Sequence, residues 1–187
     1  MTPSAALLHR IEQTPALAGA LVCPSDFDIT RRDPIDTLLI ADGVPLHPMA
    51  GRDAGGTYYL CGPAGSGQRP VLYTDSEGRA TLIGADLIEA ITLVVVLPFW
   101  RDVQSEFTLD ELKSELLEHH PDFEAERDRL LHALDLPALP EAEAATRLLT
   151  VAARTSPAYV PYVRDAGLHP YDLFFGEQPS GNTWRGA

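Results

Sequence analysis

The segment 55–100 constrains the fold most, because strand-forming runs alternate in it with turn residues and lead into a capped helix. Residues 57–61 and 71–74 are rich in aromatic and β-branched side chains, which suit a half-buried, pleated surface. Residues 75–78, Asp-Ser-Glu-Gly, combine side chains that bond a local turn with a glycine that accepts a positive φ, and residues 80–83 continue as a strand. We therefore expect three adjacent antiparallel strands.

A helix is expected directly after these strands. Asp86 can accept a hydrogen bond from the unpaired amides of the first turn while Glu89 reaches back, as in a capping box. Pro98 has no amide hydrogen and must end the helix. The segment thus predicts an α+β fold in which an antiparallel meander, over about residues 57–83, is packed by helices.

The C-terminal half has helical character. Thr108 and Glu111 form a second capping box, and leucines recur after them at helical spacing. Prolines interrupt this pattern, so we expect several helices in the segment 108–155, which makes the C-terminal half helical. Residues 159–163 return to strand character, and their proline restricts them to the edge or end of a sheet.

The length of 187 residues favours one domain, which we place at residues 1–177. Residues 38–40 predict a short strand or a turn of helix, and a loop is expected from residue 42 to the glycine pair at 55–56. The tail 178–187 is rich in glycine and polar residues, and we expect it to be disordered.

The strongly acidic composition limits the partners. Lys+Arg 14 against Asp+Glu 27 gives a formal net charge of −13, which repels nucleic-acid phosphates and anionic lipid headgroups. The same charge favours encounter with a basic protein, although solubility alone also explains it. The longest apolar run, residues 90–100, is shorter than the ~20 residues of a membrane span, and no charged segment followed by an apolar one opens the chain. With two cysteines only, a cytoplasmic location is expected.

The glycine-rich stretch 62–67 resembles a phosphate-binding loop in composition only. A phosphate loop needs a helix N-terminus directly after it, whereas this stretch leads into another strand. We interpret it as a hairpin loop and expect no cofactor.

The cysteine and histidine residues suggest two further chemistries. Cys61 is a possible nucleophile if folding brings a histidine to it, and otherwise a small core residue. His119 and His120 are adjacent, and neighbouring side chains on a helix point about 100° apart, so they do not chelate one ion together. Glu115 shares a helical face with His119, but two ligands are too few, and we expect no metal site.

Acidic residues near the turns are candidates for a paired-carboxylate site or for partner contacts. Turn positions suggest exposure, and exposed carboxylates keep ordinary pKa values, which disfavours acid–base catalysis. Trp100 next to an arginine is a candidate interface anchor or a core residue. The predicted partner-binding residues are Asp53, Asp75, Glu77, Trp100 and Asp102.

The chain resembles the SUKH superfamily, the SMI1/KNR4-like proteins. The resemblance rests on the glycine pair and strand at 55–60, the strand at 70–73, the turn at 76–78 and the helix end at 97–100. The N-terminal signature of that family, a Leu-Pro before an aromatic-bearing helix and then Asn-Gly-Gly, has no clear counterpart at residues 21–27. Membership would imply a binding fold without a motif-defined active site, found in bacterial immunity proteins that neutralise toxins, often nucleases, and in regulatory scaffolds.

These observations leave three hypotheses. The first is a non-catalytic protein-binding module, an immunity-type inhibitor of a basic toxin. The second is a small cysteine-dependent enzyme that uses Cys61 or an unrecognised carboxylate site. The third is a regulatory adaptor subunit.

Overall fold

The structure, a computed structural model, describes residues 2–34, 36–66, 68–164 and 169–176 and has the expected α+β architecture. Five strands form the main sheet in the order β2-β3-β4-β5-β7, and β1 pairs with β6 in a smaller antiparallel sheet. The strands are β1 Leu38–Ile40, β2 Leu46–Gly51, β3 Thr57–Cys61, β4 Val71–Thr74, β5 Arg79–Gly84, β6 Pro161–Val163 and β7 Asp172–Leu173.

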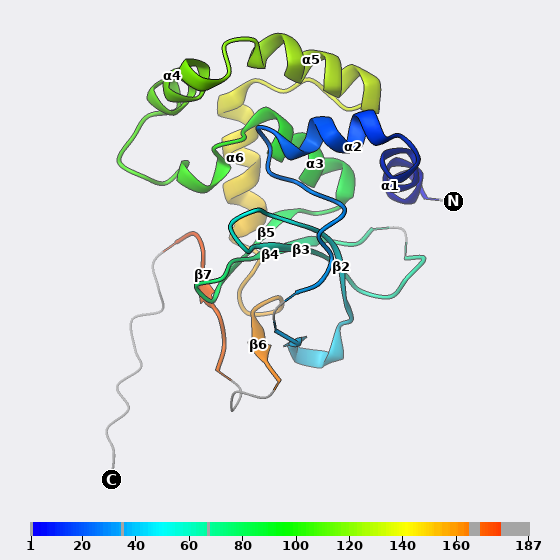
Figure 1. Ribbon diagram of the computed structural model, residues 1–187. Helices are drawn as coiled ribbons and strands as arrows, with labels where there is room; N and C mark the ends of the chain where they lie inside the picture. The colour runs from blue at the N-terminus through cyan, green and yellow to red at the C-terminus, as the bar shows by residue number, and fades with distance from the viewer. Residues whose placement is uncertain (1, 35, 67, 165–168, 177–187) are drawn as a thin grey trace.

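The predicted meander β3-β4-β5 forms the centre of the main sheet. Tyr58 lies opposite Tyr73, and Tyr73 lies opposite Thr81, in antiparallel register. Side chains alternate between two buried faces: Tyr58 and Tyr73 face the helices, whereas Leu72 and Leu82 face the second, smaller core beside β1 and β6. The meander is therefore covered on both sides (Figure 1).

Helices cover one face of the main sheet in two layers (Figure 1). They are α1 Pro3–Gln13, α2 Pro15–Val22, α3 Leu87–Val96, α4 Leu109–His119, α5 Phe123–Leu134 and α6 Glu141–Ala152. α3 is the inner helix, and its side chains from Ala90 to Val96 are buried. α4 and α5 lie farthest from the sheet, at the top of Figure 1. The outer layer of helices is therefore formed by α4 and α5.

Both predicted helix starts are capped by side chains, and the one at α4 is a complete capping box. The Asp86 carboxylate accepts a hydrogen bond from the amide of Glu89 at 2.9 Å, and the Glu89 carboxylate accepts one from the amide of Ala85 at 2.7 Å. Thr108 and Glu111 form the reciprocal pair at the start of α4. The segment 108–155 contains three helices separated at its prolines, as expected.

Two strands were not expected. The prediction of a loop between residues 42 and 55 is wrong, because β2 lies there and pairs antiparallel with β3. β2 contains Pro48 and a register shift between Pro48 and Ala50, both typical of an edge strand. β7 lies parallel to β5, joined by the Phe174 amide and the Ala80 carbonyl at 2.9 Å. The strand conformation of β2 and β7 therefore depends on pairing with β3 and β5 more than on the strand propensity of their own residues.

No helix within the described ranges is both long and apolar enough to cross a membrane. The tail 178–187, expected to be disordered, lies outside the described residues.

Candidate functional site

The predicted anchor Trp100 lies in the core. It is 1% exposed, and its ring packs 5.0 Å from Tyr73 and 5.5 Å from Phe174, measured between ring centroids. Trp100 had two interpretations, an interface anchor or a core residue, and the structure shows the core residue. A partner cannot reach the ring without rearrangement of this aromatic cluster.

Asp75 stabilises the β4–β5 turn, and the expectation that it is exposed is wrong. Its side chain is 9% exposed and accepts hydrogen bonds from the amides of Glu77 and Arg79, at 3.0 and 2.9 Å. It also pairs with the Arg79 guanidinium at 2.7 Å. An aspartate at the start of a turn often accepts a hydrogen bond from the backbone amide two residues on. The carboxylate oxygens of Asp75 are engaged within the turn in this way and in the pair with Arg79.

The other predicted carboxylates are exposed but lie in different surroundings. Asp53 is 88% exposed and pairs with Arg31 at 2.7 Å, and Glu77 pairs with Arg79 at 2.8 Å. Asp102 is exposed and borders a hollow beside α4. The five predicted residues therefore do not form one site: two have structural roles, two extend from turns of the sheet, and Asp102 belongs to the helical side.

The two cysteines differ in reactivity. Cys61 is buried on β3, and this burial raises the pKa of its thiol to about 12, which keeps it protonated at neutral pH. Cys23 is exposed, and its sulfur lies 4.0 Å from Nε2 of His120 at the end of α4. The accessible cysteine–histidine pair therefore involves Cys23, which no motif in the sequence singled out.

Residues 62–66, the described part of the glycine-rich stretch, lie in the connection between β3 and β4, as predicted, and the next element is the strand β4. His120 ends α4, and His119 belongs to its last turn, where a histidine opposes the negative end of the helix dipole. In the part of the chain that the structure describes, no cluster of three His, Cys, Asp or Glu side chains could hold a metal ion.

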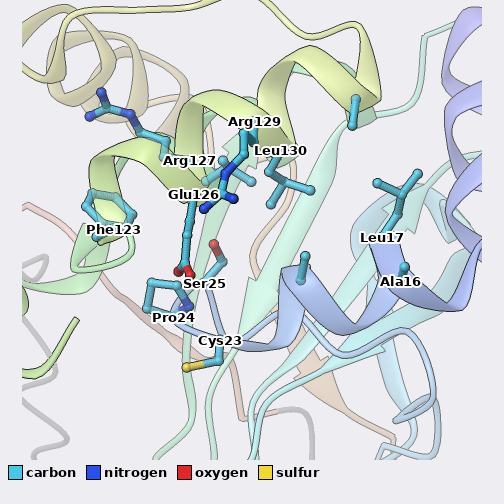
Figure 2. A pocket seen from close by; sticks show the side chains of 13 residues that line it. Ala16, Leu17, Cys23, Pro24, Ser25, Phe123, Glu126, Arg127, Arg129 and Leu130 are labelled. Atoms are coloured by element: carbon cyan, nitrogen blue, oxygen red, sulfur yellow. The ribbon is translucent and has the colours of Figure 1, made fainter. Parts of the chain in front are cut away.

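A hollow lies between α2 and α5. It encloses about 600 Å³ and is lined mostly by apolar side chains. In Figure 2, Leu17 points into it from α2 and Leu130 from α5, while Glu126 extends from α5 toward Pro24 and Ser25. Space remains there because the residues that face each other across it are small, among them Ala16, Ala20 and Ala133.

A second hollow, of about 510 Å³, lies between the segment after α2 and α4. Cys23 and Pro24 line both hollows, so the two are neighbours, and we call them together the helical groove. The second hollow has an apolar wall that includes Val22 and Leu116. Asp102 and Glu115 also line it.

α2 is unusual for a helix on the surface of a domain. Its sequence PALAGALV contains no polar or charged side chain, yet Ala16 and Ala20 are exposed and the exposed fraction of Val22 is 40%. A helix that is apolar all round is normally buried. The exposed side of α2 is thus an apolar surface beside the helical groove.

Negative charge is concentrated around this groove. Residues 101–150 contain 13 of the 27 carboxylates and five of the 14 basic side chains. Many of these carboxylates lie on the exposed faces of α4 and α5. Sequence reasoning placed the candidate contacts at the turns of the meander, but the structure has an apolar hollow of about 600 Å³ and this acidic surface together on the helical side.

No family model, curated protein or solved structure matches this chain.

Proposed function

We propose that this protein is a non-catalytic binding module of the cytoplasm that neutralises a basic protein, most concretely an immunity-type inhibitor of a toxin such as a nuclease. The observation that carries the proposal is the acidic surface of α4 and α5 beside the apolar helical groove. The resemblance to the SUKH superfamily, drawn from the segment 55–100, supports a binding role independently.

The physical argument rests on complementarity. A nuclease presents a basic surface to nucleic-acid phosphates, and an acidic protein competes for that surface. Complementary charge mainly raises the association rate, whereas an apolar contact that excludes water slows dissociation. The helical side of this protein offers both, since exposed carboxylates surround an apolar depression.

The interaction is tested by capture from the native host. The tagged protein is used as bait at low and high salt, and captured proteins are identified by mass spectrometry. We expect a protein with a basic domain that is retained at low salt and lost at high salt. That protein is then expressed with and without this chain. Growth inhibition that this chain relieves supports the proposal, whereas a partner without toxicity favours the adaptor hypothesis instead.

A second function, a cysteine-dependent enzyme, is favoured by one observation, the exposed Cys23 beside His120. This pair takes the place of Cys61, whose thiol is buried. The discriminating experiment is Cys23→Ser. Loss of a turnover activity with this variant would favour the enzyme, whereas full retention of partner neutralisation would support the binding module.

A further inference from the structure

We propose that the helical groove receives an amphipathic helix of the basic partner, with the basic end of that helix over Asp102 and Glu115 and its other end at Arg129. This inference rests on the proposed function and adds the shape and orientation of the segment that is bound. Its grounds are the apolar walls, the unpaired charges at the two ends and the exposed apolar side of α2.

The walls fit a helix with one apolar face. Leu17 of α2 faces Leu130 of α5 across the larger hollow, and Ala20 and Ala133 also line it. Small residues on facing helices allow a third helix to approach closely, and its larger side chains then fill the space between them. Recognition of an amphipathic helix by an apolar groove is a recurring mode of peptide binding.

The charges make the groove directional. At the α4 end, Asp102 and Glu115 form no ion pair within the described part of the chain. At the α5 end, Arg129 likewise has no ion-pair partner among the described residues, and its side chain donates a hydrogen bond only to the Ala125 carbonyl at 3.1 Å. Glu126, which lines the larger hollow with Arg129, also forms no ion pair in the described ranges and offsets the charge of Arg129, so the α4 end of the groove is the more negative one. An uneven distribution of unpaired charge along the groove favours one orientation of a charged guest.

Two further charged groups at the groove are already compensated. Asp26 pairs with Arg52 at 2.6 Å, and Arg127 pairs with Asp128 and Glu141 at 3.0 and 3.1 Å. They therefore contribute less to the choice of guest than the unpaired groups do. The positive end of a guest helix dipole would also lie favourably at the acidic end, which makes that end the expected place of its N-terminus.

The probe is a synthetic amphipathic helix of about 18 residues. A hydrocarbon staple holds it helical, because a free peptide lacks the tertiary packing that supplies most of the stability of a helix in a protein. Leucines follow one face, lysines occupy the N-terminal end, and glutamates the C-terminal end. The comparison peptide exchanges the lysines and glutamates and keeps the leucines. Binding is measured by fluorescence anisotropy with the full chain, and we expect the first peptide to bind roughly tenfold more tightly than the second.

The test variant is Ala133→Arg, which fills the larger hollow from an exposed helical position. Its matched control is Ala125→Arg, also exposed on α5 but outside the lining of the hollow. Arginine is a good helix former, so both variants should fold, which circular dichroism verifies. We expect Ala133→Arg to weaken peptide binding roughly tenfold and Ala125→Arg to change it by less than about twofold. Ala20→Arg on α2 provides an independent second variant.

Cys23 supplies a readout of position, because it lines both hollows and its thiol is exposed. Bound peptide should slow its alkylation by iodoacetamide. Equal binding of the two peptides, equal loss in both arginine variants, or no protection of Cys23 overturns the proposal. Self-association of the chain that Ala133→Arg abolishes assigns the groove to a second copy and also overturns it.

The failure of this inference differs from the failure of the proposed function. A captured toxin that binds Ala133→Arg normally leaves the function standing and removes the groove from it. Peptide binding in the groove without any basic partner in the host removes the function and leaves the groove as a helix-binding site.

Discussion

Tyr73 connects the core of the sheet to a partly buried ion pair. Its hydroxyl accepts a hydrogen bond from the Arg52 guanidinium at 3.1 Å, and Arg52 pairs with Asp26. Gly56 is required beside it, because any Cβ there would overlap the Tyr73 ring. This contact gives a physical reason for the glycine at 56 in the segment on which the SUKH resemblance rests.

Tyr73→Phe should lower the free energy of unfolding by about 1–3 kcal/mol, because the partly buried Arg52 loses a hydrogen-bond acceptor. Tyr58→Phe is the matched control, since the buried Tyr58 hydroxyl has no hydrogen-bond partner among the described residues. We expect the control to be neutral or slightly stabilising. Urea unfolding of the two variants measures the difference, and equal losses would contradict this account.

The two cysteines should react at very different rates with iodoacetamide at neutral pH. Cys23 is exposed, whereas Cys61 is buried and its pKa is raised to about 12 by loss of solvation. Mass spectrometry should show one modification of the folded protein and two after denaturation. In Cys23→Ser, the folded protein should stay unmodified, and rapid labelling of Cys61 in that variant would disprove the assignment.

At the scale of the elements, the β4–β5 turn depends on Asp75. Asp75→Ala removes the acceptor of two amide hydrogen bonds and of the Arg79 pair, and we expect a loss of about 1–3 kcal/mol in stability. Glu77→Ala in the same turn removes only an exposed pair with Arg79 and should cost less than about 1 kcal/mol. Thermal unfolding compares the stability of the two variants. A loss of stability in Glu77→Ala as large as that in Asp75→Ala would refute the role of Asp75 in the turn.

The turn at Asp28, between α2 and β1, should contribute to acid sensitivity. Burial opposes ionisation of Asp28, but hydrogen bonds from Thr30 and the pairing with Arg31 outweigh it and lower the pKa of this carboxyl. A carboxyl with a lowered folded-state pKa stabilises the fold above its unfolded pKa of about 3.9, and this contribution disappears as pH falls through the folded pKa. Urea unfolding should therefore show stability falling from about pH 5 downward.

Asp28→Asn keeps an acceptor oxygen for Thr30 and removes the titration. The variant should be less stable than the parent protein at neutral pH and nearly equal to it in acid, so its stability should depend less steeply on pH. Parallel curves for the two proteins would show that Asp28 does not contribute.

The elements that the sequence predicted are those with local signals. Asp86 and Thr108 mark helix starts by their own hydrogen bonds, and the turn residues at 75–78 mark the hairpin. β2 was missed because Pro48 and its neighbours have little strand propensity and are ordered by pairing with β3. The helical groove was missed because it arises between helices distant in sequence, although the all-apolar α2 was a signal for it.

At the scale of the whole molecule, the placement of charge matters more than its sum. Asp53 and Glu77, at turns of the sheet, are each paired with an arginine. Glu115 and Glu118 on α4 are exposed and have no ion pair in the described ranges. Uncompensated charges produce the stronger field at a distance, so a basic partner should be drawn to the helical side.

Two double variants with the same change of net charge test this placement. Glu115→Lys with Glu118→Lys should slow association with the captured partner roughly tenfold at low salt and reduce the dependence of the rate on salt. Asp53→Lys with Glu77→Lys should have the smaller effect, because these carboxylates already lie beside arginines. Stopped-flow or surface-based kinetics at two salt concentrations measures both. A larger effect at Asp53 and Glu77 would place the partner at the turns of the meander, and equal effects would mean that only net charge steers the encounter.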